Sequence, residues 1–275
     1  MNLFVRQIIF AFVGLLCHSI PLDAYENFLP GSRFLALSEC GTAIPDVWSV
    51  SQNQAGLTYL SHPAFALSSE HRYLMKELTV HSLAIAYPQH FGTFGTSINY
   101  YGFTKYHELK TGLAYALPLG QKLSVGIMLS YFSSFIEGAS KNLNRITGEI
   151  GIMSNPIPLL TIGLHIFNPL PENTRKGQDA TLPTTLRFGI AYKIRSIVTI
   201  ATETQTGTSQ KNDYKFGIEF YPITNLALEL GLNTMPARLS CGINYLFKHF
   251  NFGIAFANHQ ILGTTTTVDL SYSIY

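Results

Sequence analysis

The stretch LKTGLAYAL at residues 109–117 decides the fold class. Its odd positions carry Leu, Thr, Leu, Tyr and Leu, whereas the even positions between them carry Lys, Gly, Ala and Ala. Alternation at a period of two is the pattern of a β-strand with two unlike faces. The same pattern recurs in LSVGIMLSY at 123–131 and in LRFGIAYKI at 186–194. Two different environments must therefore flank one sheet.

Segments of this kind follow one another from residue 64 to the end of the chain. They predict fourteen strands, an even number, at residues 64–72, 78–87, 92–102, 108–117, 122–132, 145–154, 159–168, 184–194, 197–206, 213–221, 226–234, 238–247, 250–257 and 265–274.

The connections between the predicted strands alternate in length. Those after even-numbered strands have four residues or fewer. Those after odd-numbered strands are longer and include Ser133 to Asn144 and Pro169 to Pro183, with residues 235–237 as the one short exception. Outer-membrane barrels have short periplasmic turns and longer external loops. The pattern therefore predicts a barrel with both of its ends in the periplasm.

Composition supports a membrane environment. Charged residues make up 12% of the 275 positions, against roughly 25% in soluble domains. The net charge of +2 argues against a nucleic-acid binder. After the N-terminus no apolar run reaches the roughly 20 residues of a membrane-spanning helix, which excludes a helical membrane protein. A secreted β-sandwich is the alternative, but it predicts a normal charge density on its exposed face.

An unpaired backbone amide in hydrocarbon costs several kcal/mol, so a sheet in a bilayer must close on itself. We therefore expect an all-β protein, a transmembrane antiparallel β-barrel of about 14 strands in the outer membrane of a Gram-negative cell. Its expected partners are outer-membrane lipids and the barrel-assembly machinery, which would recognise the terminal aromatic residue Tyr275.

The N-terminus has the features of a secretory signal peptide. Residues 1–24 contain one early cation, Arg6, an apolar core at 8–16, and Ala24 before the expected cleavage point. A lipoprotein attached at Cys17 is the alternative, but Leu16 is large for that motif. We predict a signal peptide at 1–24, a plug at 25–63 and a barrel at 64–275. No disulfide is expected between Cys40 and Cys241.

The predicted plug contains GSRFLALSECGTAIPDVWSV at 31–50 and SQNQAGL at 51–57. This stretch resembles the N-terminal region of the long-chain fatty-acid transporter (FadL) superfamily, and more closely its PorV/PorQ branch, which is associated with type IX secretion. The motif residues are Gly31, Arg33, Pro45, Asp46, Trp48, Asn53, Ala55, Gly56 and Leu57. Two departures are Gln54, where the common form has proline, and the shortness of the chain.

The resemblance implies an accessory or cargo-handling component of a type IX-like secretion system, which would engage secretion-channel subunits or secreted cargo through its external loops. The alternative is a FadL-like transporter of hydrophobic small molecules through a gap in the wall. A transporter should have an apolar lumenal pocket that reaches a strand kink. An accessory barrel should have a sealed lumen and an apolar patch on its external loops.

Catalytic and metal chemistry is not expected. His165 is the only histidine predicted at a mid-strand, lumen-facing position, and it is read as a hydrogen-bonded wall residue. The sequence has no Gly-x-Ser-x-Gly elbow and no Cys or His pair at metal-ligand spacing. We therefore predict no enzyme, no cofactor and no metal.

Five charged residues are predicted to face the lumen, where a charge must be hydrated or paired. Arg187, Glu203 and Lys215 are expected to meet as one cluster, with Glu219 and Glu229 as neighbouring acids. Our hypothesis is that these lumenal charges brace the plug by pairing with its residues Arg33, Glu39 or Asp46. The alternative is a hydrated wall without a bracing role.

Overall fold

The computed structural model describes residues 28–138, 142–170, 182–208 and 210–274. It contains fourteen strands: β1 (Ala64–His71), β2 (Thr79–Gln89), β3 (Gly92–Phe103), β4 (Tyr106–Leu119), β5 (Leu123–Ile136), β6 (Leu143–Ile157), β7 (Leu160–Phe167), β8 (Thr185–Ile194), β9 (Val198–Gly207), β10 (Gln210–Ile223), β11 (Leu226–Thr234), β12 (Ala237–Phe247), β13 (Phe250–His259) and β14 (Gly263–Ser273).

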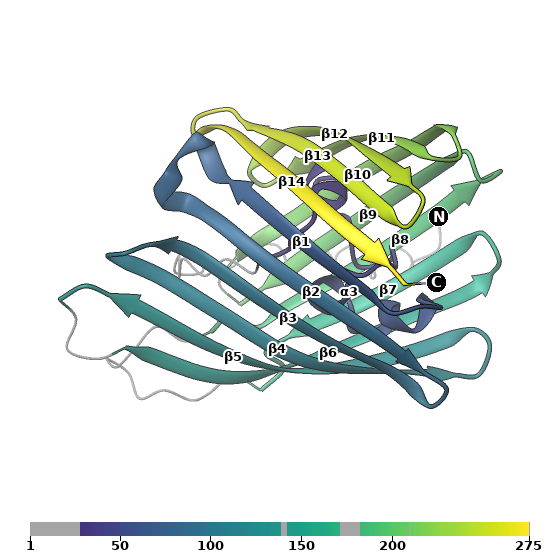
Figure 1. The fold of residues 1–275 in the computed structure, drawn as a ribbon, viewed down its shortest axis with the longest axis horizontal. Coiled ribbons are helices and arrows are strands. Elements are labelled where there is room, and N and C mark those ends of the chain that lie inside the picture. The colour runs from purple at the N-terminus through teal and green to yellow at the C-terminus, as the bar shows by residue number, and fades with distance from the viewer. Residues whose placement is uncertain (1–27, 139–141, 171–181, 209, 275) are drawn as a thin grey trace, which may run out of the picture.

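The strands form one closed antiparallel barrel in sequence order (Figure 1). β1 closes it by pairing with β14, from Ala64 opposite Ser273 to His71 opposite Thr266. Closure leaves no unpaired edge, as a sheet in hydrocarbon requires. The prediction of a 14-stranded antiparallel barrel is therefore confirmed. In the described part of the chain, no helix is long and apolar enough to cross a membrane.

The two faces of the wall differ as the alternation predicts. Outward-facing side chains are large and apolar, and Leu113 and Leu230 are 70% and 62% exposed. Inward-facing residues are mainly Gly, Ala, Ser and Thr, and Ala84 and Ala116 are fully buried. An outward apolar band with a small, polar interior is the arrangement of a transmembrane barrel.

The lengths of the connections between strands differ in part from the lengths predicted from the sequence. Those after even-numbered strands have two or three residues, as predicted. After odd-numbered strands, however, residues 104–105 and 208–209 are also two-residue links. Half of the predicted loop Ser133–Asn144 is strand, because β5 runs to Ile136 and β6 starts at Leu143. Side-chain alternation ends before the backbone pairing does, so the sequence pattern overestimates loop length.

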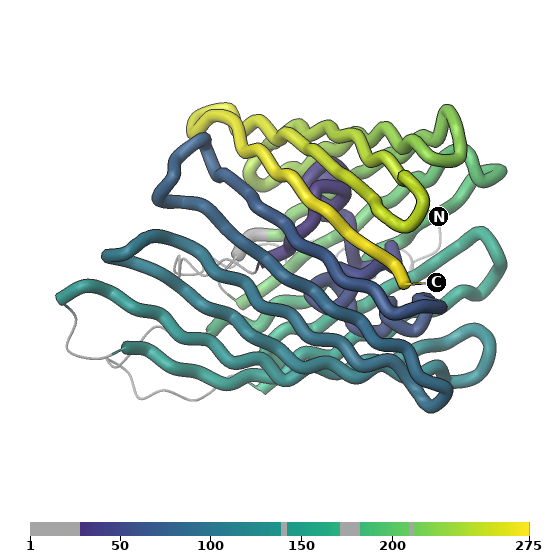
Figure 2. Tube along the Cα trace, viewed as in Figure 1, coloured from purple at the N-terminus to yellow at the C-terminus, as the bar shows by residue number. Residues whose placement is uncertain are grey.

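The N-terminal residues 28–63, here called the lumenal segment, run inside the ring of strands (Figures 1 and 2). They form α2 (Ser32–Ala36), α3 (Ser49–Gln52) and the 3₁₀ helix η1 (Gln54–Tyr59). Two further 3₁₀ turns, η2 (Arg72–Leu74) and η3 (Lys76–Leu78), lie in the β1–β2 connection. The predicted signal peptide, most of Pro169–Pro183 and Tyr275 lie outside the described residues.

Candidate functional site

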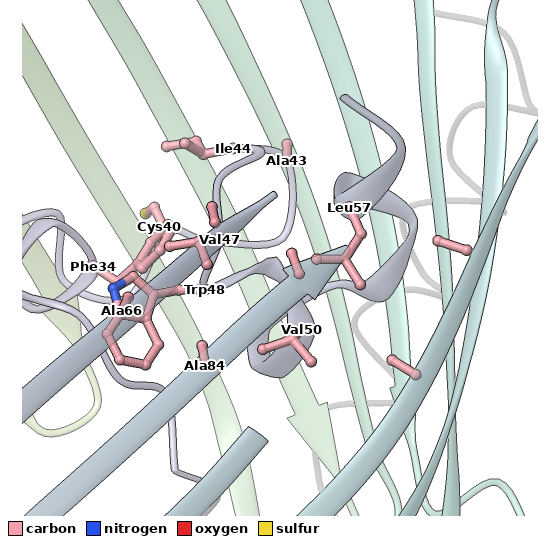
Figure 3. Close-up of a cluster of buried hydrophobic side chains, with 14 of the residues drawn as sticks. Phe34, Cys40, Ala43, Ile44, Val47, Trp48, Val50, Leu57, Ala66 and Ala84 are labelled. Carbon is pink, nitrogen blue, oxygen red and sulfur yellow. The ribbon is translucent and has the colours of Figure 1, made fainter. Parts of the chain in front are cut away.

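The lumenal segment reaches both sides of the barrel interior. α2 contacts β11, β12, β13 and β14, whereas η1 contacts β3, β4, β5 and β6. Between these contacts the segment forms its own apolar core, in which Phe34, Trp48, Val50 and Leu57 are buried (Figure 3). The interface between this segment and the wall is the candidate functional site.

Glycines in the wall let the segment backbone approach closely. A Cβ added to Gly231 in β11 would lie 2.6 Å from the carbonyl oxygen of Ala36. At Gly126 in β5 it would lie 2.7 Å from the amide nitrogen of Ala55, and at Gly163 in β7 it would overlap the carbonyl oxygen of Thr42. The spacing between wall and segment is therefore set by residues without side chains.

Gly31 and Trp48 of the motif lie against each other. Gly31 has a φ of 108°, and a Cβ there would lie 2.8 Å from Trp48 Cδ1. The Trp48 indole N–H donates to Asp269 Oδ2 of β14 at 3.2 Å, and its backbone N–H donates to Asp46 Oδ1 at 2.7 Å. Pro45 is half-buried beside this turn. Trp48 thus joins the apolar core of the segment to a lumenal carboxylate.

Arg33 of the motif binds a predicted lumenal acid. Its Nε and Nη2 atoms donate to the two carboxylate oxygens of Glu219 in β10, at 2.7 and 2.8 Å. Arg33 Nη1 lies 3.7 Å from Asp46 Oδ2. Glu229 faces Glu219 across the β10–β11 pair and accepts two hydrogen bonds from Asn244. The two neighbouring acids therefore have different partners.

The Asn-x-Ala-Gly-Leu box fixes the turn between α3 and η1. Asn53 Nδ2 donates to the carbonyl oxygens of Thr42 and Ile152, at 2.7 and 3.1 Å, and its Oδ1 accepts from the Ala55 N–H. Ala55, Gly56 and Leu57 are fully or almost fully buried in η1. Asn53 therefore links two parts of the segment to β6.

Gln54, which stands where the common motif has proline, bonds both to the segment and to the wall. Its Nε2 donates to the carbonyl oxygen of Val50 at 3.0 Å and to Glu149 Oε2 of β6 at 3.2 Å. A proline at this position would make neither bond. The substitution therefore adds a polar contact between segment and wall.

Arg187 and Glu203 form a buried pair, with Nε and Oε1 2.6 Å apart. Both residues also bind the segment. Arg187 donates to the carbonyl oxygens of Gln52 and Glu39 at 3.2 and 3.1 Å, and Glu203 Oε2 accepts from the Thr42 N–H at 2.9 Å. Each partner therefore holds the other and the segment backbone at once.

Lys215 lies opposite Glu203 in the β9–β10 register, but its ammonium bonds to Glu39 Oε2 at 3.0 Å and to Gln205. Arg238 Nη2 donates to the other Glu39 oxygen at 2.6 Å. Burial raises the pKa of the Glu39 carboxyl, but Lys215 and Arg238 outweigh it and hold that pKa well below its usual range. Glu39 is therefore a charged anchor of the segment.

A further buried centre was missed by the sequence reading. Glu149 of β6 accepts from Lys110 of β4 at 2.8 Å and from Ser130 of β5 at 2.7 Å. His165 Nε2 lies 3.1 Å from its other oxygen, so His165 is a hydrogen-bonded wall residue. Lys110 also lies over the Phe132 ring. A charged residue at an inward position in mid-strand, as in LKTGL, is the signal that would have identified this centre.

The wall of β14, β1, β2 and β3 carries a hollow of about 540 Å³. Its lining includes outward-facing Leu67, Leu83 and Ile98, together with Ser68 and Ser82, which face the lumen. The pairing of β1 with β14 and with β2 continues through this region without a register shift. The hollow is therefore a recess in a continuous wall, and it is not the lumenal pocket at a strand kink that was expected of a transporter.

The side chains at the interface make ion pairs and hydrogen bonds that hold the segment. No three His, Cys, Asp or Glu residues in the described ranges are placed to hold a metal ion. Cys40 is buried in the segment and Cys241 is exposed on β12, and both are free. Arg187, Glu203, Lys215 and Glu219 all lie within the interface or directly beside it.

No protein-family model and no curated protein matches the sequence. Solved structures share its fold. The toluene transporter TodX of Pseudomonas putida matches with a TM-score of 0.67 at 11% identity, covering 91% of this chain and 100% of TodX. A FadL homologue of Pseudomonas aeruginosa gives 0.65 at 9% identity, covering 94% and 100%. The fold is that of the FadL-like outer-membrane β-barrels.

Proposed function

We propose that the protein is an outer-membrane channel for hydrophobic small molecules, in which the lumenal segment acts as a movable plug. The observation that carries this proposal is the way in which the segment occupies the lumen. Discrete ion pairs and hydrogen bonds attach it to the wall, including Arg33 to Glu219 and Glu39 to Lys215. Such contacts can break one by one when the segment moves.

The chemistry of the segment favours an apolar permeant. Phe34, Val50 and Leu57 and the wall alanines Ala84 and Ala116 belong to one buried apolar cluster. If the segment shifts, these surfaces line the path that opens, and an apolar molecule can replace the contacts that are lost. TodX, whose fold this chain shares, is described as a toluene transporter, which supports the same class of permeant.

The orientation follows from the connections. The two longest, residues 72–78 and 168–184, and the six-residue connection 137–142 all join strands at one end of the barrel. The two- and three-residue turns that follow even-numbered strands lie at the opposite end, together with the C-terminal end of β14. External loops of such barrels are the longer ones. We therefore assign the long connections to the cell exterior and the C-terminus to the periplasm.

The test is uptake by Gram-negative cells that lack their own FadL-type channel. Cells that make this protein should take up toluene and a radiolabelled long-chain fatty acid faster than cells with an empty vector. A hydrophilic sugar serves as the control and should enter at the same rate in both. Equal uptake of the hydrophobic probes with and without the protein would contradict the proposal.

An accessory role in type IX secretion is the second candidate. It is favoured by exposed apolar side chains on two neighbouring connections. Leu74 and Met75 lie in the β1–β2 connection, and Ile261 and Leu262 lie in the β13–β14 connection. The β1–β2 connection reaches the start of β14, where the Tyr73 N–H donates to Thr265 Oγ1 at 3.4 Å, so the two connections are neighbours. Such a patch suits a protein partner.

This second role predicts that a tagged protein co-purifies with secretion-channel subunits or secreted cargo in mild detergent. Replacing Leu74 and Ile261 by Ser should abolish that recovery. Purification without such proteins, combined with uptake of the hydrophobic probes, would leave the channel as the function.

A further inference from the structure

The barrel end that carries the short turns (Figure 1) has cations in those turns but no acids. All six turns after even-numbered strands lie in the described part of the chain, and none contains aspartate or glutamate. Lys122, Arg195 and Lys248 lie in three of these turns, and Lys193 lies near the end of β8. All four residues are exposed. These turns therefore form a positively charged surface.

Acids in other parts of the barrel have their own partners. At the opposite end, Lys105 lies 3.6 Å from Glu137, and Arg72 bonds to Glu70 at 2.7 Å. Three lumenal acids in the strand halves next to the short turns are bonded inside the barrel: Glu219 to Arg33, Glu229 to Asn244 and Asp269 to Ser32. The cations of the short turns are therefore not neutralised by these acids.

Three of the cations lie on neighbouring turns. The Lys122 ammonium donates to the carbonyl oxygen of Pro156 at the end of β6, at 3.0 Å. The Lys193 N–H donates to the carbonyl oxygen of Leu159 in the β6–β7 turn at 2.9 Å, and Arg195 lies in the next turn. We call Lys122, Lys193 and Arg195 the basic rim. No aspartate or glutamate occurs in these turns or the adjoining strand ends, residues 117–125, 153–162 and 190–200.

The basic rim adjoins the lipid-facing surface of the barrel. Leu123 follows Lys122 directly, Ile194 precedes Arg195 directly, and Ile157 lies at the end of the strand between them. All three aliphatic side chains are exposed. In a bilayer such side chains lie in hydrocarbon, so a cation one residue beyond them lies at the depth of the lipid headgroups. This continuity favours a lipid over a soluble polymer as the partner.

We propose that the basic rim binds anionic phospholipids, with phosphates beside Lys122 and Arg195 and acyl chains along Leu123, Ile157 and Ile194. A lysine or arginine near a membrane surface attracts lipids with a net negative charge. The amine of a zwitterionic headgroup would instead be repelled by the basic rim. This binding goes beyond the proposed channel, and only the assignment of the lipid to the periplasmic leaflet rests on the orientation given above.

The test is native mass spectrometry of the full-length protein released from nanodiscs that contain equal parts of phosphatidylglycerol and phosphatidylethanolamine. The wild type should retain phosphatidylglycerol preferentially, whichever way the barrel is oriented. Arg195→Gln should lower the ratio of bound phosphatidylglycerol to bound phosphatidylethanolamine about fivefold, which corresponds to about 1 kcal/mol. The triple variant Lys122→Gln, Lys193→Gln and Arg195→Gln should remove the preference.

Two variants are matched controls and should keep the ratio of the wild type. Ile197→Gln places the same new side chain in the same turn without changing its charge. Lys105→Gln removes the same charge at the opposite end, where Glu137 accompanies the lysine. Equal retention of the two lipids by the wild type would overturn the proposal. A decrease in either control as large as that in Arg195→Gln would overturn the assignment to the basic rim.

Discussion

Arg33 in the lumenal segment and Glu219 in β10 form a two-point ion pair, with Nε to Oε1 and Nη2 to Oε2 distances of 2.7 and 2.8 Å. This geometry is the strong, directional form of an arginine–carboxylate contact. Glu219 is 1% exposed at its side chain, and the Glu229 carboxylate is its cross-strand neighbour. Without Arg33, the buried acids Glu219 and Glu229 would face each other, and Glu219 would lose the cation that binds it.

Arg33→Met should therefore destabilise the protein by about 2–3 kcal/mol, because it leaves the Glu219 carboxylate buried without its cation. Thermal unfolding in detergent measures the loss. Lys105→Met is the control, since the Lys105–Glu137 pair is 3.6 Å apart and its side chains are 71% and 62% exposed. An exposed pair contributes little. A loss at Arg33 no larger than at Lys105 would contradict the bracing role.

Exchanging Arg187 and Glu203 in a double variant should restore only part of the hydrogen-exchange protection that either single charge reversal loses. The exchanged pair can still meet, but a carboxylate at 187 would face the carbonyl oxygens of Gln52 and Glu39. An arginine at 203 would face the Thr42 N–H. The readout is amide hydrogen exchange in residues 39–53, which should stay fast in the exchanged variant. Full recovery of protection would show that the pair acts within the wall alone.

Because the pKa of the Glu39 carboxyl is depressed, we expect acid to weaken the attachment of the lumenal segment to the wall. A carboxyl whose pKa is depressed in the folded protein stabilises it above the ordinary glutamate pKa of about 4.3, and that stability is lost as the pH falls further. Melting temperatures of the wild type should therefore drop between neutral pH and pH 3. Glu39→Gln should start lower and show a smaller drop. Parallel pH profiles for the two proteins would refute this prediction.

Gly231→Ala should detach the segment without opening the barrel. The new methyl group would lie 2.6 Å from the Ala36 carbonyl oxygen, and crowding of this kind costs about 1–3 kcal/mol. Hydrogen exchange should rise in α2 but not in the strands. Gly148→Ala is the control, because its nearest contact would be an ordinary one of 3.9 Å. Equal protection of α2 in both variants would argue against close packing at Gly231.

Much of the fold could be predicted from the sequence. Alternation in stretches such as residues 109–117 specifies both the strands and the face that each side chain takes, because the period of a strand is two. Strand ends could not be predicted equally well. Phe103 and Tyr106 pair beyond the predicted strands 92–102 and 108–117, and no side-chain pattern marks that pairing.

Only part of the candidate site could be predicted from the sequence, and the reason is physical. The strand pattern places Arg187 and Glu203 on neighbouring strands, two register positions apart, so they could be placed together before their distance was known. The path of the lumenal segment has no such periodicity. Its pairing of Arg33 with Glu219 and of Glu39 with Arg238 depends on contacts across about 200 positions of sequence, which local patterns do not encode.

In the proposed channel, the lumenal segment must move before a hydrophobic molecule can pass. Ser38 in the segment and Ser240 in β12 offer a lock, because their hydroxyl oxygens lie 2.7 Å apart. Cysteines at both positions, in a background with Cys40→Ala and Cys241→Ser, should form a disulfide with an S–S bond of about 2.05 Å. The bond would tie the segment to the wall.

The deciding measurement is toluene uptake by cells carrying this double-cysteine variant, oxidised and then reduced. Uptake should fall to the empty-vector level when the disulfide is formed and recover on reduction, whereas Ser240→Cys alone in the same background should be unaffected by the oxidant. Uptake at the full rate with the disulfide verified by mass spectrometry would show that toluene passes without movement of the lumenal segment.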